Sequence, residues 1–179
     1  MNRKSAAVLL FCGLLFIFLS CGKDNDDEDL KTIGSVTLKI EGKDYKFKLR
    51  QGMSTPIDEK TLYTGVLMGN EDIFNAVTVY ITSSDMGEGD YSISGETVFE
   101  EKYKKEKMAE ISIAIIGKED KAAIFYKING EQQTTQKLRI QMKDDKKHYF
   151  LTENLELTED SDKIATPKKI TVKNINNLY

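Results

Sequence analysis

Few side chains in this 179-residue chain could carry out nucleophilic, acid–base or metal chemistry. The chain has two cysteines, Cys12 and Cys21, and one histidine, His148. A lone histidine could act as a general base, but transition-metal sites use two or more His or Cys ligands. Because His148 follows two lysines at the expected start of a strand, we interpret it as a surface residue. The sequence therefore predicts no catalytic, cofactor-binding or metal-binding residue.

The hydroxyl and carboxyl groups do not define a site by their spacing. The chain has no G-x-S-x-G motif, and only one histidine could serve any serine, so nucleophilic hydrolysis is unsupported. The 29 acidic residues allow many carboxylate pairs, which leaves a glycosidase as a minor alternative. Asp85, Glu88 and Asp90 share one glycine-rich turn and offer oxygen ligands for calcium. They lack the D-x-D-x-D-G spacing, however, and turns favour Asp and Gly for backbone reasons alone.

Cys21 stands where an apolar segment ends. Met1–Ser5 carry two positive charges, and the 14 residues Ala6–Leu19 carry none. This apolar run has the length of the core of an export signal and is shorter than the ~20 residues of a membrane-spanning helix. Residues 1–20 are therefore predicted to be a signal peptide that is removed.

The segment Phe18-Leu19-Ser20-Cys21 resembles the lipobox of bacterial lipoproteins. The resemblance implies that a diacylglycerol is attached to the thiol of Cys21, that cleavage falls before Cys21, and that the new amine is acylated. Two or more acyl chains, at ~0.8 kcal/mol per buried methylene, give stable anchoring to a membrane. The alternative is an uncleaved anchor helix that buries Cys21, but the apolar run stops abruptly at this residue.

The residues behind Cys21 are predicted to form a flexible tether, residues 21–33. Five of the eight residues Gly22–Asp29 are acidic and none is apolar, so this run cannot bury surface and repels itself. Fully extended at ~3.3 Å per residue, the tether would reach ~40 Å. An acidic run behind the lipidated cysteine also resembles the signal that sends Bacteroidota lipoproteins to the outer face of the outer membrane. We therefore expect surface exposure, with a periplasm-facing location as the alternative.

Composition limits what the remaining chain can be. Loss of Arg3 and Lys4 with the signal changes the net charge from −3 to −5, which disfavours a nucleic-acid partner. Residues 34–179 contain no cysteine, so this part has no disulfide and no thiolate metal site. Its length suits a single domain that depends on its hydrophobic core.

From residue 34 onward, apolar and polar residues alternate in the manner of half-buried strands. The clearest pair is Val36–Ile40 and Tyr45–Leu49, joined by a glycine-containing turn. About nine strands predict an all-β domain, built as an antiparallel two-sheet sandwich. The charged segment Phe99–Glu110 is interpreted as a loop rather than a short helix. The other predicted strands contain the apolar stripes of residues 77–81, 91–93, 111–115, 124–128, 138–142, 150–157 and 170–172, with turns at Asn129-Gly130, Asp144-Asp145 and Pro167.

A family resemblance supports this fold. Val36–Tyr45 is similar to the opening of many small, uncharacterised Bacteroidota surface lipoproteins, in which a strand is followed by a "DGK"-like turn and an aromatic residue. Gly89–Ile93 looks like their "G-x-Y" strand entry. These motifs encode hairpins rather than chemistry, so the resemblance implies a fold and a location.

The leading hypothesis is a non-enzymatic binding or accessory module, anchored to the outer membrane, whose partner is an envelope protein or a glycan. Its binding surface is expected at the inter-strand loops 50–60, 82–90 and 95–108. A glycan would stack on exposed rings, for which Tyr63, Tyr80 and Tyr103 are the candidates, although core packing explains most tyrosines. The alternative is a periplasm-facing inhibitor or immunity lipoprotein.

Overall fold

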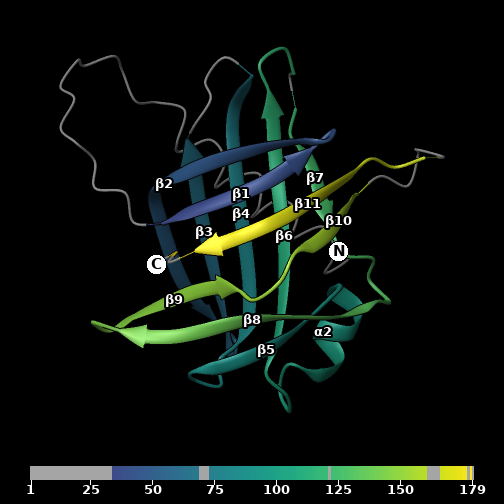
Figure 1. Ribbon diagram of the computed structural model, residues 1–179. Coiled ribbons are helices and arrows are strands. Elements are labelled where there is room, and N and C mark those ends of the chain that lie inside the picture. The colour runs from purple at the N-terminus through teal and green to yellow at the C-terminus, as the bar shows by residue number, and fades with distance from the viewer. Residues whose placement is uncertain (1–33, 69–72, 121, 161–165, 177, 179) are drawn as a thin grey trace, which may run out of the picture. The chain divides into compact units, whose positions relative to one another are not determined.

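The computed structural model describes residues 34–68, 73–120, 122–160, 166–176 and Leu178. These residues belong to one compact unit. The signal peptide, Cys21 and the acidic tether lie outside the described residues. Eleven strands and one short helix make up the described part of the chain (Figure 1). They are β1 (Ser35–Ile40), β2 (Lys43–Ile57), β3 (Lys60–Met68), β4 (Phe74–Ser84), β5 (Gly89–Ser94), α2 (Glu96–Lys102), β6 (Met108–Gly117), β7 (Ile124–Lys127), β8 (Gln133–Lys143), β9 (Lys146–Leu151), β10 (Leu155–Glu159) and β11 (Lys169–Asn176).

Eight of the strands close into a barrel. They follow the order β4-β3-β2-β1-β11-β10-β7-β6, and β6 pairs with β4 to complete the ring. From β6, the parallel strand β5 leads to β8 and β9, which form an additional small sheet. A bridge between Tyr149 and Leu178 joins β9 to the chain beyond β11. The prediction of an all-β domain is therefore confirmed.

The prediction of a two-sheet sandwich is wrong, and β2 shows why. This 15-residue strand pairs with β1 through Lys43–Lys48 and with β3 through Lys48–Ile57. The register shifts between Leu49 and Gln51, as at a β-bulge, which lets one strand turn from one layer into the next. Together with the β4–β6 pairing, this shared strand makes the layers parts of one closed sheet.

Three two-residue turns with positive φ set the register of the hairpins. Glu41-Gly42 joins β1 to β2 with φ values of 48° and 84°, and Asp144-Asp145 joins β8 to β9 with 51° and 59°. Such values are typical of the turns that match strand twist. Both turns were predicted from the sequence. The third, Asp58-Glu59 with 45° and 62°, lies in the segment expected to be a loop, most of which belongs to β2.

The inward-facing residues of the barrel strands, together with those of β5, β8 and β9, form one hydrophobic core. Removing a Leu, Ile, Val or Phe side chain from water contributes roughly 1.5–3 kcal/mol each, and this core has no disulfide to support it. Tyr63 is completely buried among these residues, and its hydroxyl occupies the space beside Gly65, where a Cβ would lie 2.7 Å away. Glycine at position 65 therefore makes room for the tyrosine. Representative core residues are Val36, Leu38, Phe47, Val79, Ile113, Leu157 and Val172.

The segment Phe99–Glu110 is not simply a loop, as its charges suggested. The helix α2 covers Glu96–Lys102, and β6 begins at Met108. Phe99 and Tyr103, four residues apart, lie on one face of this turn with stacked rings 5.6 Å apart, and both are buried with Met108. This buried aromatic pair fixes the helix against β6, while its charged residues face solvent. Within the described residues, no helix has the length and apolar character required to cross a membrane.

Candidate functional site

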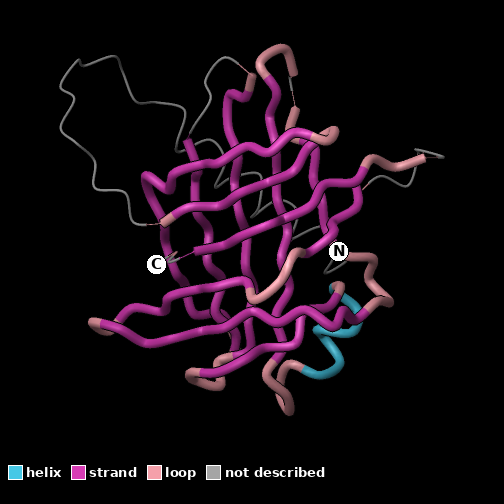
Figure 2. Tube along the Cα trace, in the orientation of Figure 1, coloured by secondary structure: helices cyan, strands magenta, loops and turns pink. Residues whose placement is uncertain are grey.

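Three segments that are distant in sequence meet at one end of the barrel. The backbone N–H of Asp85 donates to the carbonyl oxygen of Glu59 at 3.0 Å, and the Ser84 hydroxyl donates to the carbonyl of Glu106 at 3.0 Å. Figure 2 shows α2 and several turns gathered at the lower end of the strands. We call residues 58–61, 84–89 and 99–107 the convergent end. It joins parts of all three segments in which the sequence placed a binding surface.

Lys60 ties α2 to the β2–β3 turn. Its Nζ lies 2.5 Å from Oε1 of Glu100 and 4.1 Å from the centroid of the Tyr103 ring. The side chain of Lys60 is 16% exposed, so its cation–π contact is partly shielded from water. Lys104 and Glu59 form a second ion pair at 3.4 Å, but both side chains are exposed, and such pairs contribute little. The half-buried Lys60 is therefore the main link between α2 and the turn.

Lys147 of β9 binds two further residues of the convergent end. Its Nζ donates to Oγ1 of the buried Thr61 and to Oδ1 of Asp85, both at 2.6 Å. The sequence did not identify this contact, because Thr61 and Lys147 are 86 residues apart. These hydrogen bonds fix the turns in one arrangement, as a preformed binding surface requires.

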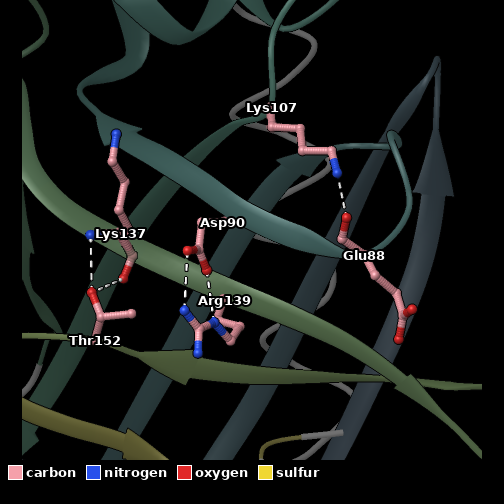
Figure 3. Close-up of polar contacts among 6 residues, drawn as sticks. All are labelled: Glu88, Asp90, Lys107, Lys137, Arg139 and Thr152. Atoms are coloured by element: carbon pink, nitrogen blue, oxygen red, sulfur yellow. Dashed lines mark hydrogen bonds and ion pairs between the residues drawn. The ribbon is translucent and has the colours of Figure 1, made fainter.

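Each of the three carboxylates considered as calcium ligands interacts with a different partner. Asp85 pairs with Lys147, and Oε1 of Glu88 accepts a hydrogen bond from the backbone N–H of Met142. Asp90 accepts two hydrogen bonds from Arg139, at 2.7 and 3.1 Å (Figure 3), and these bonds hold the pKa of Asp90 below its ordinary value. In the described ranges, no group of three or more His, Cys, Asp or Glu residues is placed to hold a metal ion.

His148 is buried, with 7% of its surface exposed, so the interpretation as a surface residue is wrong. It pairs with Gln141 across β8 and β9, where a shallow hollow of about 380 Å³ opens. The charged residues next to His148 in the sequence suggested exposure. They do not show that neighbouring strands cover the His148 ring after folding. The hollow is lined by Glu88, Gln141, Met142, Lys143, His148 and Phe150.

The rings considered for glycan stacking are mostly unavailable. Tyr63 is completely buried and Tyr103 is 6% exposed, because one belongs to the inward stripe of β3 and the other packs against Phe99. Tyr80 is half-buried on the outer face of β4 and stacks on Phe125, with ring centroids 6.5 Å apart. Of the three candidates, only Tyr80 therefore presents part of its ring to solvent.

Glu110 is the titratable residue that sequence reasoning missed. It lies on the outer side of β6, where burial raises the pKa of its carboxyl to about 7, and the negative charges of Glu96 and Glu100 act in the same direction. The two nearby lysines are engaged elsewhere: Lys60 pairs with Glu100, and Lys127 pairs with Asp160 at 2.9 Å. The alternation of β6 indicates that Glu110 faces outward, but it does not show that α2 lies beside it.

A Glu110→Gln variant is expected to be more stable than the parent at pH 8. The folded-state pKa of about 7 lies above the ordinary value of 4.5, so the native state binds the proton more tightly than the unfolded state does. Stability therefore falls as pH rises from 4.5 to 7 and stays low above 7. At ~1.36 kcal/mol per pKa unit, the variant should gain about 3 kcal/mol at pH 8 and less than about 1 kcal/mol at pH 5.

Urea unfolding of parent and variant at the two pH values measures this difference. Glu153→Gln, at an exposed position between β9 and β10, is the matched control and should change neither value. An equal gain from Glu110→Gln at pH 5 and pH 8 would show that the carboxyl is not held neutral in the folded protein.

No protein-family model, curated protein or solved structure matches this chain. The convergent end offers fixed charges of both signs and turns held by hydrogen bonds. Glu110 has the pKa of a general acid, but it is not among the described residues that line the hollow beside His148.

Proposed function

We propose that this chain is an outer-membrane lipoprotein whose β domain is a non-enzymatic binding or accessory module at the cell surface. The observation that carries the proposal is Cys21, which follows a basic flank, a short apolar run and the small residue Ser20. The acidic run Asp24–Asp29 behind it supports export to the outer face and a flexible connection. The partner is an envelope protein or a glycan, and the lipid anchor holds the module at the membrane.

The convergent end is the proposed binding surface. Binding residues are commonly carried on loops that a rigid scaffold positions, and here the closed barrel provides the scaffold. Exposed residues of both signs lie at this end, such as Glu59 and Lys104. Complementary charges of this kind give specificity toward a polar partner rather than affinity for any apolar surface.

Reversing one exposed charge at this end tests the assignment. Full-length parent and Lys104→Glu protein are compared for retention on immobilised outer-membrane proteins and purified surface polysaccharides. Lys104→Glu should reduce retention several-fold, because it places a like charge beside Glu59 and against the partner. Lys39→Glu, on the outer face of β1, is the matched control. Equal retention of both variants would exclude the convergent end as the contact surface.

A periplasm-facing inhibitor or immunity lipoprotein is the second candidate, since the same anchor could face inward. Trypsin added to intact cells distinguishes the two locations, because Lys23 and Lys31 flank the acidic run of the tether. Release of the domain from intact cells supports the surface location. Release only after the outer membrane is permeabilised supports the inward-facing candidate and contradicts the surface proposal.

A further inference from the structure

The hollow beside His148 lies on the outer face of the β8–β9 hairpin. Gln141 of β8 pairs with His148 of β9. Because side chains alternate along a strand, Lys143 and Phe150, each two residues further along, share this face. The turn before β5 adds Glu88. The volume of about 380 Å³ lies within the ~300–1,000 Å³ of small-molecule sites, so the hollow can hold a small ligand or one unit of a polymer.

Three side chains of the hollow have hydrogen-bonding groups that a ligand can use. Oε1 of Glu88 accepts a hydrogen bond from the backbone N–H of Met142, but Oε2 has no partner among the described residues. Figure 3 shows this carboxylate extending away from Lys107, whose ammonium binds the carbonyl oxygen of Glu88 instead. Gln141 and Lys143 are exposed, and neither side chain has a partner in the described ranges. The hollow therefore offers an acceptor, a donor and an amide that is both.

This set of groups favours a ligand that is rich in hydroxyls. A hydroxyl group donates to a carboxylate and accepts from an ammonium, so the hydroxyls of one sugar can bind Glu88 and Lys143 together. The opposite charges of these two residues favour a neutral ligand. An apolar ligand would remove both charges from water without replacing their hydrogen bonds. A peptide strand would need a free strand edge, whereas β8 is paired on both sides, with β5 and with β9.

Phe150 provides the apolar surface on which one face of a sugar ring can stack. Its side chain is half-buried, and it lines the hollow. The buried ring of His148 lies on the same face of β9, so this part of the hollow is held in place by the fold. One aromatic ring combined with a few fixed polar groups is the usual composition of a small-molecule site. The sequence indicated only tyrosines for this role, and Phe150 was not among its candidates.

We propose that this hollow binds one sugar unit of a neutral surface polysaccharide. Phe150 stacks on the sugar ring, and Glu88, Gln141 and Lys143 bind its hydroxyls. This inference rests on the proposed function and names the class of its ligand. Glu88 belongs to the convergent end, so the hollow continues that surface onto the β8–β9 hairpin. Because the hollow is shallow, we expect a dissociation constant of about 1 mM for a single unit.

His148 allows a direct test, because it is the only histidine of the chain and its ring lines the hollow. Its imidazole C–H groups therefore give a unique pair of NMR signals. The full-length protein in phosphocholine micelles is titrated at constant pH with neutral trisaccharides of glucose, galactose, mannose and N-acetylglucosamine. At least one of these sugars should shift both signals and reach saturation at millimolar concentration, whereas glycerol should shift neither.

Variants show whether the shift reports binding in the hollow. Phe150→Ala should weaken binding of the active trisaccharide about tenfold, because the stacking surface is lost. Gln141→Ala and Lys143→Ala should each weaken it several-fold, and their exposed positions keep the test valid if Phe150→Ala does not fold. Phe125→Ala removes a half-buried ring from the outer face of β7 and is the matched control, with binding equal to that of the parent.

The outcomes distinguish this inference from the proposed function. The sugar assignment is overturned if no trisaccharide shifts the His148 signals, if glycerol shifts them equally, or if Gln141→Ala and Lys143→Ala bind as the parent does. Reduced retention of Lys104→Glu on outer-membrane proteins would still support the proposed function in each of these cases, because Lys104 is not among the described residues that line the hollow.

Discussion

A Cys21→Ala variant is expected to lose fatty-acid labelling completely and to disappear from the outer-membrane fraction. The lipid is proposed to be held by the Cys21 thiol, which an alanine side chain cannot replace. Cleavage is proposed to fall directly before the lipid-bearing residue, so we expect it to fail when that residue cannot carry the lipid. The variant should therefore keep residues 1–20 and show a larger mass for its peptide portion than the mature parent.

Cys12→Ala is the matched control for this experiment. Cys12 lies within the apolar run, nine residues before Cys21, and alanine preserves the apolar character that export requires. Labelling, mass and fractionation of Cys12→Ala should equal those of the parent. If Cys21→Ala also matches the parent in all three measurements, the lipoprotein assignment and the proposed location both fail.

The strands could be predicted because alternation is a local property. Val36, Leu38 and Phe47 reveal their buried side through neighbours two residues away, and the β1–β2 hairpin has the expected turn. Closure of the barrel depends instead on the bend in β2 and on the pairing of β4 with β6. Neither leaves a periodic signal, so a two-sheet sandwich and a barrel give the same local pattern.

The candidate site likewise combines features that are local in sequence with contacts that form only on folding. Turn-forming residues identified the segments of the convergent end, but the contacts that join them are remote in sequence, such as the pair of Lys60 and Glu100. The ionisation of Glu110 likewise depends on α2, which packs beside it only after folding. The predicted exposure of His148 was wrong for a related reason. Its neighbours in the sequence are hydrophilic, but its ring is buried in the folded protein. Local pattern locates loops and strands, whereas pairing and burial determine their chemistry.

The connection between α2 and the β7–β8 turn leads to the largest expected loss of stability. The backbone N–H of Gly95, which precedes α2, donates to the carbonyl of Gln132 at 2.9 Å, and that of Val98 donates to Gly130 at 3.2 Å. A Cβ on Gly95 would overlap the carbonyl oxygen of Asn129 and lie 2.5 Å from its carbonyl carbon. Gly95 has a φ of −75°, which any residue can adopt, so the requirement for glycine is purely steric.

Gly95→Ala is therefore expected to cost about 3 kcal/mol or more, at the upper end of overpacking effects, because the obstructing atoms belong to backbone and cannot rotate away. Gly130→Ala is the matched control from the same contact. Its Cβ would meet Oγ1 of Thr97 at 3.0 Å, and this side chain can change rotamer, so the loss should stay below about 1 kcal/mol. Urea unfolding compares the two variants, and hydrogen exchange at Phe99 and Tyr103 reports whether α2 detaches. Equal unfolding midpoints for the two variants would mean that the β7–β8 turn shifts at little cost in free energy. In that case α2 is held by its aromatic residues rather than by the backbone contact at Gly95.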